Sequence, residues 1–167
     1  MKKHGFWKGI WNFELCDKDG NVLKAWSKEN ALADEGESLM LDGFFRGQNR
    51  PTAFYVRLFN DTPVETDTLA ALTGEPSGNG YAAQTLSVNT TDFPTLELDA
   101  GDYQVVSKQV VFTAAGGAIP EVGSVTYAVL ATTSDNTGKL VAFVELSEAR
   151  RLPDTAQLKI TFTIKLQ

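Results

Sequence analysis

The residues with the clearest capacity for chemistry are carboxylates in the segments between the expected strands. Two carboxyl groups that converge in a cleft can act as general acid and general base, as they do in glycoside hydrolysis. Seven residues could supply such a pair: Glu65, Asp67, Glu75, Asp92, Glu97, Asp99 and Asp102. Sequence does not fix their separation, so a hydrolytic pair and a solvated acidic rim both stay open. We favour the acidic rim and expect no enzymatic activity.

Histidine and cysteine chemistry has very little material in this chain. His4 is the only histidine and Cys16 is the only cysteine. A Ser-His-Asp or Cys-His mechanism would have to recruit His4 from the N-terminal segment, and one His with one Cys cannot supply the usual ligands of zinc. Cys16 cannot form an intrachain disulfide and is expected to be a small core residue.

Two loops look superficially like ligand-binding motifs but lack the deciding residues. A calcium loop of the EF-hand type starting at Asp17 would need Gly at its sixth position and Glu at its twelfth, where Val22 and Lys28 stand. Residues 74–80 contain three glycines without the Lys-Ser/Thr ending of a phosphate-binding loop. We therefore expect turns at both places and no cofactor, and a weak calcium site built from several loops stays open.

Length and charge narrow the class of protein. The 167 residues suit a single domain over residues 1–167, and a net charge of −6 argues against nucleic acid as a partner. No segment reaches the roughly 18–20 consecutive apolar residues of a membrane span. Lys8, Glu14 and Asp17 interrupt the apolar run that a signal peptide needs, so we expect synthesis in a cytoplasm and no membrane association.

Apolar residues alternate with polar ones over most of the chain, which is the pattern of strands with one buried face. Residues 158–166 show it most clearly, with Leu158, Ile160 and Phe162 on one side and lysines and threonines on the other. The alternation slips across residues 103–113, which indicates a bulge or a strand covered on both faces. The predicted fold is mainly β, an antiparallel β-sandwich or jelly-roll-like arrangement. Further strands are expected at 7–15, 22–26, 54–59, 122–132 and 140–146.

One amphipathic helix is expected near residues 31–46. Asp34 and Glu37 have the spacing of a capping box, and Gly47 is placed to end the helix. Leu39, Met40 and Phe44 should pack against the sheet. We expect Gly43 to mark a close approach of helix and sheet.

A loop at about residues 60–82 is too long to be a simple connection. Its middle, 66–72, is predicted to form a short helix capped by Asp67 and packed on its own domain through Leu69 and Leu72. The helix would hold the tip at 75–81 in place for a neighbouring subunit. Tyr81 is either an anchor in that contact or a residue that closes the loop onto the core.

The first strand carries aromatic residues on both faces. Trp7 and Trp11 share a face with Phe13, so at least one of the two tryptophans should lie in the core, while Phe6 and Ile10 fall on the other face. A second face this apolar needs a cover from the helix or from a neighbouring subunit. The expected interface residues are Phe6, Trp7, Glu75, Pro76, Asn79 and Tyr81.

Several of these motifs resemble a known group of proteins. Asn30-Ala-Leu32, the Gly36-to-Asp42 helix, the strand and exit Phe54-Tyr-Val-Arg-Leu-Phe-Asn-Asp-Thr-Pro63, and Glu75-Pro-Ser-Gly-Asn-Gly-Tyr81 together resemble small virion structural proteins of tailed bacteriophages. The resemblance covers about residues 11–81 and does not distinguish head, neck and tail.

The resemblance implies a non-enzymatic virion subunit, made in the bacterial cytoplasm, that contacts other virion proteins and copies of itself. An alternative stays open: a carbohydrate- or receptor-binding module of a phage particle that uses loop aromatics such as Tyr81 and Phe93.

Overall fold

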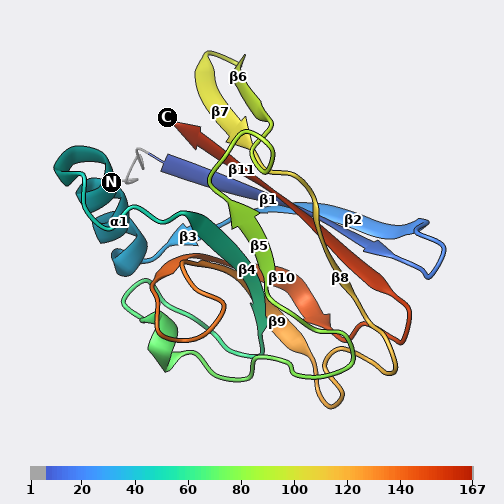
Figure 1. Ribbon diagram of the computed structural model, residues 1–167. Coiled ribbons are helices and arrows are strands. Elements are labelled where there is room, and N and C mark those ends of the chain that lie inside the picture. The colour runs from blue at the N-terminus through green and yellow to red at the C-terminus, as the bar shows by residue number, and fades with distance from the viewer. Residues whose placement is uncertain (1–6, 167) are drawn as a thin grey trace.

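The chain folds into two antiparallel sheets that pack face to face (Figure 1). The structure is a computed structural model and describes residues 7–166. Sheet A has the order β2 (Val22–Glu29), β1 (Trp7–Cys16), β11 (Gln157–Leu166), β7 (Asp102–Val106) and β6 (Thr95–Asp99), with β8 (Val110–Thr113) also paired to β11. Sheet B has the order β3 (Ala31–Leu32), β10 (Leu140–Arg150), β9 (Val125–Ala131), β4 (Ala53–Phe59) and β5 (Gln84–Ser87). The prediction of a mainly β sandwich with one helix is confirmed.

The core lies between the two sheets and is organised around β11. Leu158, Ile160 and Phe162 are at most 1% exposed, as their alternation predicted. Phe162 faces Trp11 across the β1–β11 ladder, and their ring centroids are 5.0 Å apart. Trp11 and Cys16 are both fully buried, so the expectations of a core tryptophan and a core cysteine are confirmed.

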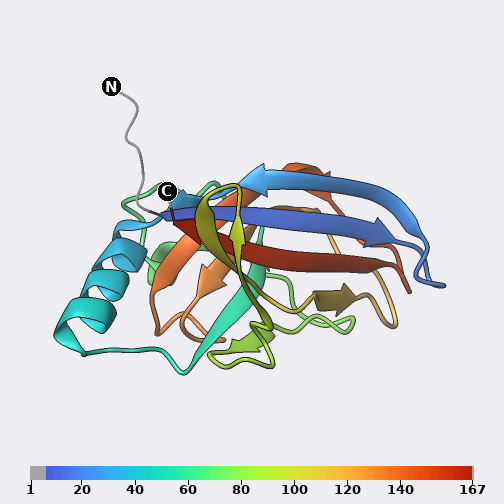
Figure 2. The same ribbon diagram turned by 90° about the horizontal axis from the view of Figure 1, so that it is seen from above.

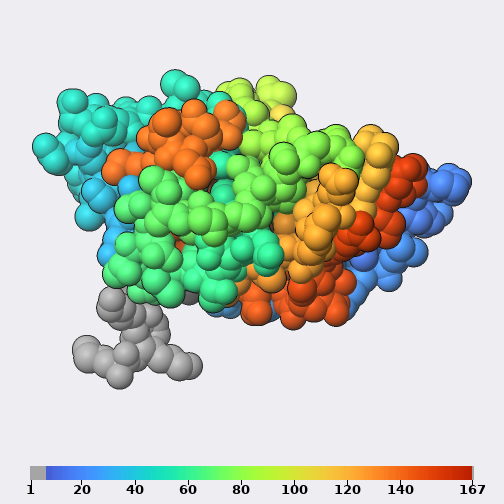
Figure 3. Space-filling model, turned by 90° about the horizontal axis from the view of Figure 1, so that it is seen from below, coloured from blue at the N-terminus to red at the C-terminus, as the bar shows by residue number. Residues whose placement is uncertain are grey.

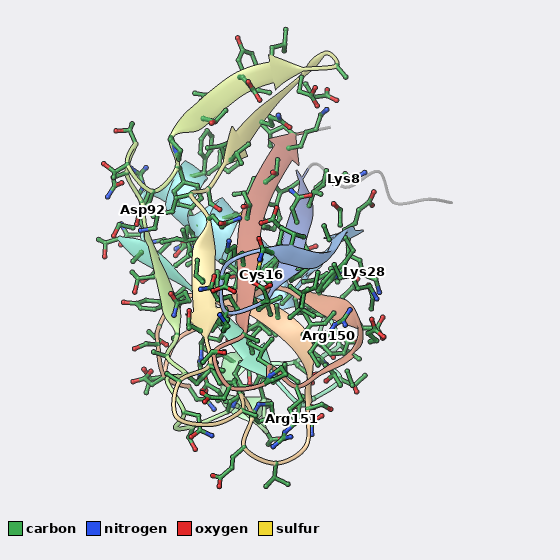
Figure 4. All side chains as sticks on the ribbon, turned by 90° about the vertical axis from the view of Figure 1, so that its right-hand side faces the viewer. Lys8, Cys16, Lys28, Asp92, Arg150 and Arg151 are labelled. Atoms are coloured by element: carbon green, nitrogen blue, oxygen red, sulfur yellow. The ribbon has the colours of Figure 1, made fainter. Side chains whose placement is uncertain are left out.

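Charged side chains join the edge strand β2 to the end of β10. Lys28 forms an ion pair with Glu145 at 2.9 Å, and Lys24 forms one with Glu148. The guanidinium of Arg150 lies 4.6 Å above the ring of Trp26. Figure 4 shows Lys28 and Arg150 on the same side of the molecule. Exposed pairs of this kind contribute at most about 1 kcal/mol each.

The slipping alternation at residues 103–113 marks an interruption between two strands. β7 and β8 pair with successive parts of β11, and the segment 107–109 separates them. The hydroxyl of Ser107 accepts a hydrogen bond from the Phe162 N–H at 2.9 Å, and the Ser107 N–H donates to the Phe162 carbonyl at 2.8 Å. Ser107 therefore satisfies the backbone of β11 across the gap. The β6–β7 hairpin, which sequence did not predict as two strands, extends beyond the sandwich (Figures 1 and 4).

The predicted helix is present as α1 (Asp34–Leu41), followed by a single π-helical turn, η1 (Asp42–Arg46). Gly47, with φ of 67°, ends it as expected. The capping box is wrong, because Ala33 occupies the N-cap position and no side chain caps the helix. Figure 2 shows α1 at one end of the two sheets. None of the helices in the described range is long and apolar enough to cross a membrane.

Two expectations about the packing of this helix are wrong. Phe44 is 78% exposed and does not pack against the sheet, whereas Leu39 is buried as predicted. The close approach occurs at Gly36, not at Gly43. A Cβ added at Gly36 would overlap the Val141 carbonyl group, with its carbon 2.8 Å away, while a Cβ at Gly43 would meet nothing nearer than Arg50 Cγ at 3.5 Å.

Gly36→Ala should therefore destabilise the protein although alanine is the better helix former. The clash is with backbone, so we expect a loss of about 3 kcal/mol, the upper end of overpacking costs. Gly43→Ala is the matched control and should leave stability within about 1 kcal/mol of the parent. Urea denaturation of the two variants measures both values, and equal stability would contradict the assigned contact.

Candidate functional site

The long loop covers part of the outer face of sheet B (Figure 3, green). A second apolar cluster lies beneath it, and Leu69 and Leu72 contribute to this cluster with 0% and 4% exposure. Their predicted packing onto the domain is confirmed. The expected helix at 66–72 is only a short 3-10 turn, η2 (Leu69–Ala71), and Asp67 does not cap it. The Asp67 carboxylate accepts a hydrogen bond from the Val64 N–H at 2.8 Å instead.

Arg57 is the central polar residue under this loop. It lies on β4 between Tyr55 and Phe59 on the outer face, and its side chain is 1% exposed. Its guanidinium binds both carboxylate oxygens of Glu75, with Nε to Oε1 at 2.8 Å. It also donates to the Asp135 carbonyl and to Asn136 Oδ1, each at 2.7 Å. Arg57 thus holds the long loop and the β9–β10 turn to one strand.

Tyr81 closes the loop onto the core, the second of the two roles considered for it. Its ring stacks on Phe112 with centroids 5.7 Å apart. Its hydroxyl accepts from the Leu58 N–H at 3.0 Å and donates to Glu75 Oε1 at 2.8 Å. Because β5 pairs with β4 only as far as Val56, the hydroxyl supplies the partner that a longer β5 would have given. Burial raises the pKa of Tyr81 well above its ordinary value.

The remaining residues predicted for an interface fall in different places. Glu75 and Pro76 line a shallow groove of about 340 Å³ together with Val122. The Asn79 amide donates to the Ala118 carbonyl at 2.8 Å, which fixes the loop tip to the β8–β9 connection. Trp7 is separate from these residues, since it packs edge-on against Phe162 in sheet A. Phe6 lies outside the described residues.

Several of the carboxylates considered for catalysis form hydrogen bonds or ion pairs that hold parts of the fold together. Asp92 binds the Lys108 ammonium at 2.7 Å and accepts from the Ser87 N–H at 2.7 Å. These contacts, with Lys108 foremost, lower the pKa of Asp92. Asp99 pairs with Lys165 at 3.0 Å. Within residues 7–166, no group of three or more His, Cys, Asp or Glu side chains could hold a metal ion.

Two projecting elements expose large apolar side chains. On the helical segment, Leu41, Phe44 and Phe45 are 60%, 78% and 73% exposed, and we call these three residues the π-turn knob. On the β6–β7 hairpin, Leu96, Leu98 and Tyr103 are 60–74% exposed, and we call these three the hairpin face. Leu98 pairs directly with Tyr103, so both lie on one side. Sequence reasoning missed both sets of exposed side chains. Apolar residues in a helix or strand are normally assigned to the core, and only the coordinates show that these two elements extend beyond the sandwich.

A protein-family model described as "Podophage GP4 fiber I protein gp80" matches residues 31–164. The chain belongs to this family. The gp80-family match spans β3 to most of β11, and the first hairpin, β1–β2, precedes it. No characterised protein matches the chain significantly. The expected resemblance to virion proteins of tailed phages is confirmed, and it is now narrower: the chain is a tail-associated structural protein of a phage particle.

The buried Arg57 contacts predict the consequence of removing their partner. Glu75→Ala leaves the guanidinium without its carboxylate, and we expect a loss of about 3 kcal/mol, the lower end for broken buried pairs because Glu75 is partly exposed. Tyr81→Phe should cost about 1–2 kcal/mol, because the Leu58 N–H loses its acceptor.

Chemical denaturation measures both effects, and Glu75→Gln is the control that keeps the hydrogen-bonding oxygen. The order of stability should be parent, Glu75→Gln, Glu75→Ala. A Glu75→Ala protein as stable as the parent would contradict a structural role for the pair.

Proposed function

We propose that the chain is a non-enzymatic building subunit of a phage fiber, and that copies of it associate with one another and with other virion proteins. The observation that carries this proposal is the exposure of the π-turn knob and the hairpin face. Monomeric soluble proteins rarely leave large apolar patches uncovered. In a particle, these surfaces would be covered by neighbouring subunits.

The geometry of the knob favours a protein partner. The rings of Phe44 and Phe45 pack edge to face with centroids 5.0 Å apart, so they form one compact apolar projection. Burying a Phe side chain contributes about 1.5–3 kcal/mol. Aromatic residues that insert into a partner in this way are typical anchors of protein interfaces.

The long loop has an indirect part in this proposal. Asn79 and Tyr81 are held by internal hydrogen bonds, so they set the position of the tip rather than offer free contacts. Glu75 and Pro76, on the groove beside the exposed Val122, remain candidates for contact with a neighbour. Trp7 is half-buried and is a candidate at the other sheet.

The packing of the two aromatics considered for receptor binding favours the structural role over that alternative. Tyr81 and Phe93 both pack against the core cluster between the sheets. The continuous core shared by the two sheets supports the expectation of one domain. The structural contacts of Asp67, Asp92 and Asp99 support a non-enzymatic role.

The knob supplies the test of association. Phe44→Ser combined with Phe45→Ser removes two largely exposed rings that pack on each other, so the fold and its thermal stability should be preserved. Sedimentation velocity should show the parent associating and the double variant shifted toward monomer. Mass spectrometry of purified particles should find at least about tenfold less of the variant, as expected if it loses 1.4 kcal/mol or more of contact energy.

Val88→Ser is the matched control, since Val88 is 52% exposed and lies outside the knob, the hairpin face and the groove at Glu75 and Pro76. It should associate and enter particles like the parent. A double Phe variant that associates and is incorporated as well as the parent would overturn the assignment of the knob.

A further inference from the structure

One end of the outer face of sheet B is left open by the long loop. A groove of about 450 Å³ lies there, a volume within the range of small-molecule sites, about 300–1,000 Å³. Its floor includes Tyr55, which precedes Arg57 by two residues on the same face of β4. Its walls are residues 49–53, which follow the helical segment, and residues 132 and 137–139 of the β9–β10 turn. Figure 3 shows this turn (orange) beside the helical segment (teal).

The groove gathers positive charge in an acidic chain. Most of the described Lys and Arg side chains form ion pairs with a carboxylate. Four in residues 7–166 have no such pair: Arg50, Lys139, Arg151 and Lys159. Two of these four, Arg50 and Lys139, line the groove, and no Asp or Glu lines it. An anion entering the groove would therefore meet two cations that form no ion pair within residues 7–166. The nearest carboxylates to the lining, Asp42 and Asp135, are hydrogen-bonded to Asn49 and Thr137.

Arg50 is held in a defined position at the groove wall. Its Nε donates to the Gly43 carbonyl at 2.7 Å, which anchors the guanidinium to η1. No bond within residues 7–166 occupies the two terminal nitrogens. A guanidinium fixed in this way retains donors that suit the two oxygens of a carboxylate or phosphate.

On the opposite wall, the β9–β10 turn is hydrogen-bonded within itself. The Lys139 N–H donates to Thr132 Oγ1 at 2.9 Å, and the Gly138 N–H donates to Thr133 Oγ1 at 3.0 Å. The Thr137 hydroxyl binds the Asp135 carboxylate at 2.6 Å and, as the main cause, lowers the pKa of Asp135. Arg57 fixes the turn from below through the Asp135 carbonyl. A preformed wall reduces the ordering cost of binding a ligand.

We propose that this groove binds an acidic saccharide, with the carboxylate or phosphate held by Arg50 and Lys139 and a sugar ring against Tyr55. Aromatic side chains present an apolar body to the C–H face of a sugar, while the polar rim binds hydroxyls. The site would give the subunit a recognition function separate from its structural role. The two roles use different residues, since Phe44 and Phe45 do not line the groove.

Calorimetric titration of the full chain with three probes tests this proposal: digalacturonate carries carboxylates, glucose 6-phosphate carries a phosphate, and maltose carries neither. We expect at least one acidic probe to bind at millimolar concentration or below in 0.15 M salt, and maltose to bind at least tenfold more weakly. Arg50→Gln and Lys139→Gln should each weaken the acidic probe at least about tenfold, as loss of a charged hydrogen bond does. Comparison of the two acidic probes identifies the preferred anion.

Lys159→Gln is the charge-matched control, because it removes an unpaired cation outside the groove. It should bind like the parent, and so should the Phe44→Ser, Phe45→Ser double variant. Failure of both acidic probes to bind would overturn the site, as would equal weakening by Lys159→Gln. Loss of association with retained binding would count against the knob alone, so the two proposals fail separately.

Discussion

The structure depends on a charge buried where a β-sandwich usually has an exposed or apolar side chain. Desolvating the Arg57 guanidinium costs several kcal/mol, and only a well-placed carboxylate with further acceptors offsets this cost. Those partners come from two distant segments, Glu75 of the long loop and residues 135–136 of the β9–β10 turn. The fold therefore strongly favours states in which both segments are seated on β4. An apolar residue at position 57 would impose no such requirement.

Three successive outer-face residues of β4 lie in three different environments. Phe59 lies under Leu69 and Leu72 in an apolar cluster, Arg57 lies in a polar network, and Tyr55 borders the open groove. Over about 13 Å of one strand, at about 3.3 Å per residue, the face changes from closed to open. The length of the covering loop decides where this change falls. The long loop, whose closure costs conformational entropy, thus determines which part of the sheet stays accessible to solvent.

Sequence reasoning predicted burial correctly where the local spacing of apolar residues determines it. It failed where burial depends on how an element is placed in the tertiary structure. The alternation of β11 predicted its buried face, and Leu69 and Leu72 were found because apolar residues in a polar loop need a cover. Phe44 was wrongly predicted to pack on the sheet because it lies in a π-helical turn. A π-helix has more residues per turn than an α-helix, so the side chain is rotated away from the face that α-helical spacing predicts. Arg57 gave no signal of burial, since its partner lies 18 residues further along the chain. The resemblance to virion proteins of tailed phages was recognised from motifs that include β4 and the long loop, while the fiber family came from the family match and the exposed surfaces and the groove required coordinates.

The pairing of β1 with β11 has a consequence for how the protein is made. Residues 7–16 form a continuous ladder with residues 157–166, so sheet A cannot close until β11 has been synthesised. Contacts across a separation of about 140–160 residues form late and slowly, because chain closure precedes any energetic gain. Until β11 is added, Trp11 and Phe13 lack their neighbours on that strand, although all strands of sheet B precede β11 in the chain. A nascent chain is thus most exposed to wrong association before β11 docks, because sheet A is incomplete until then.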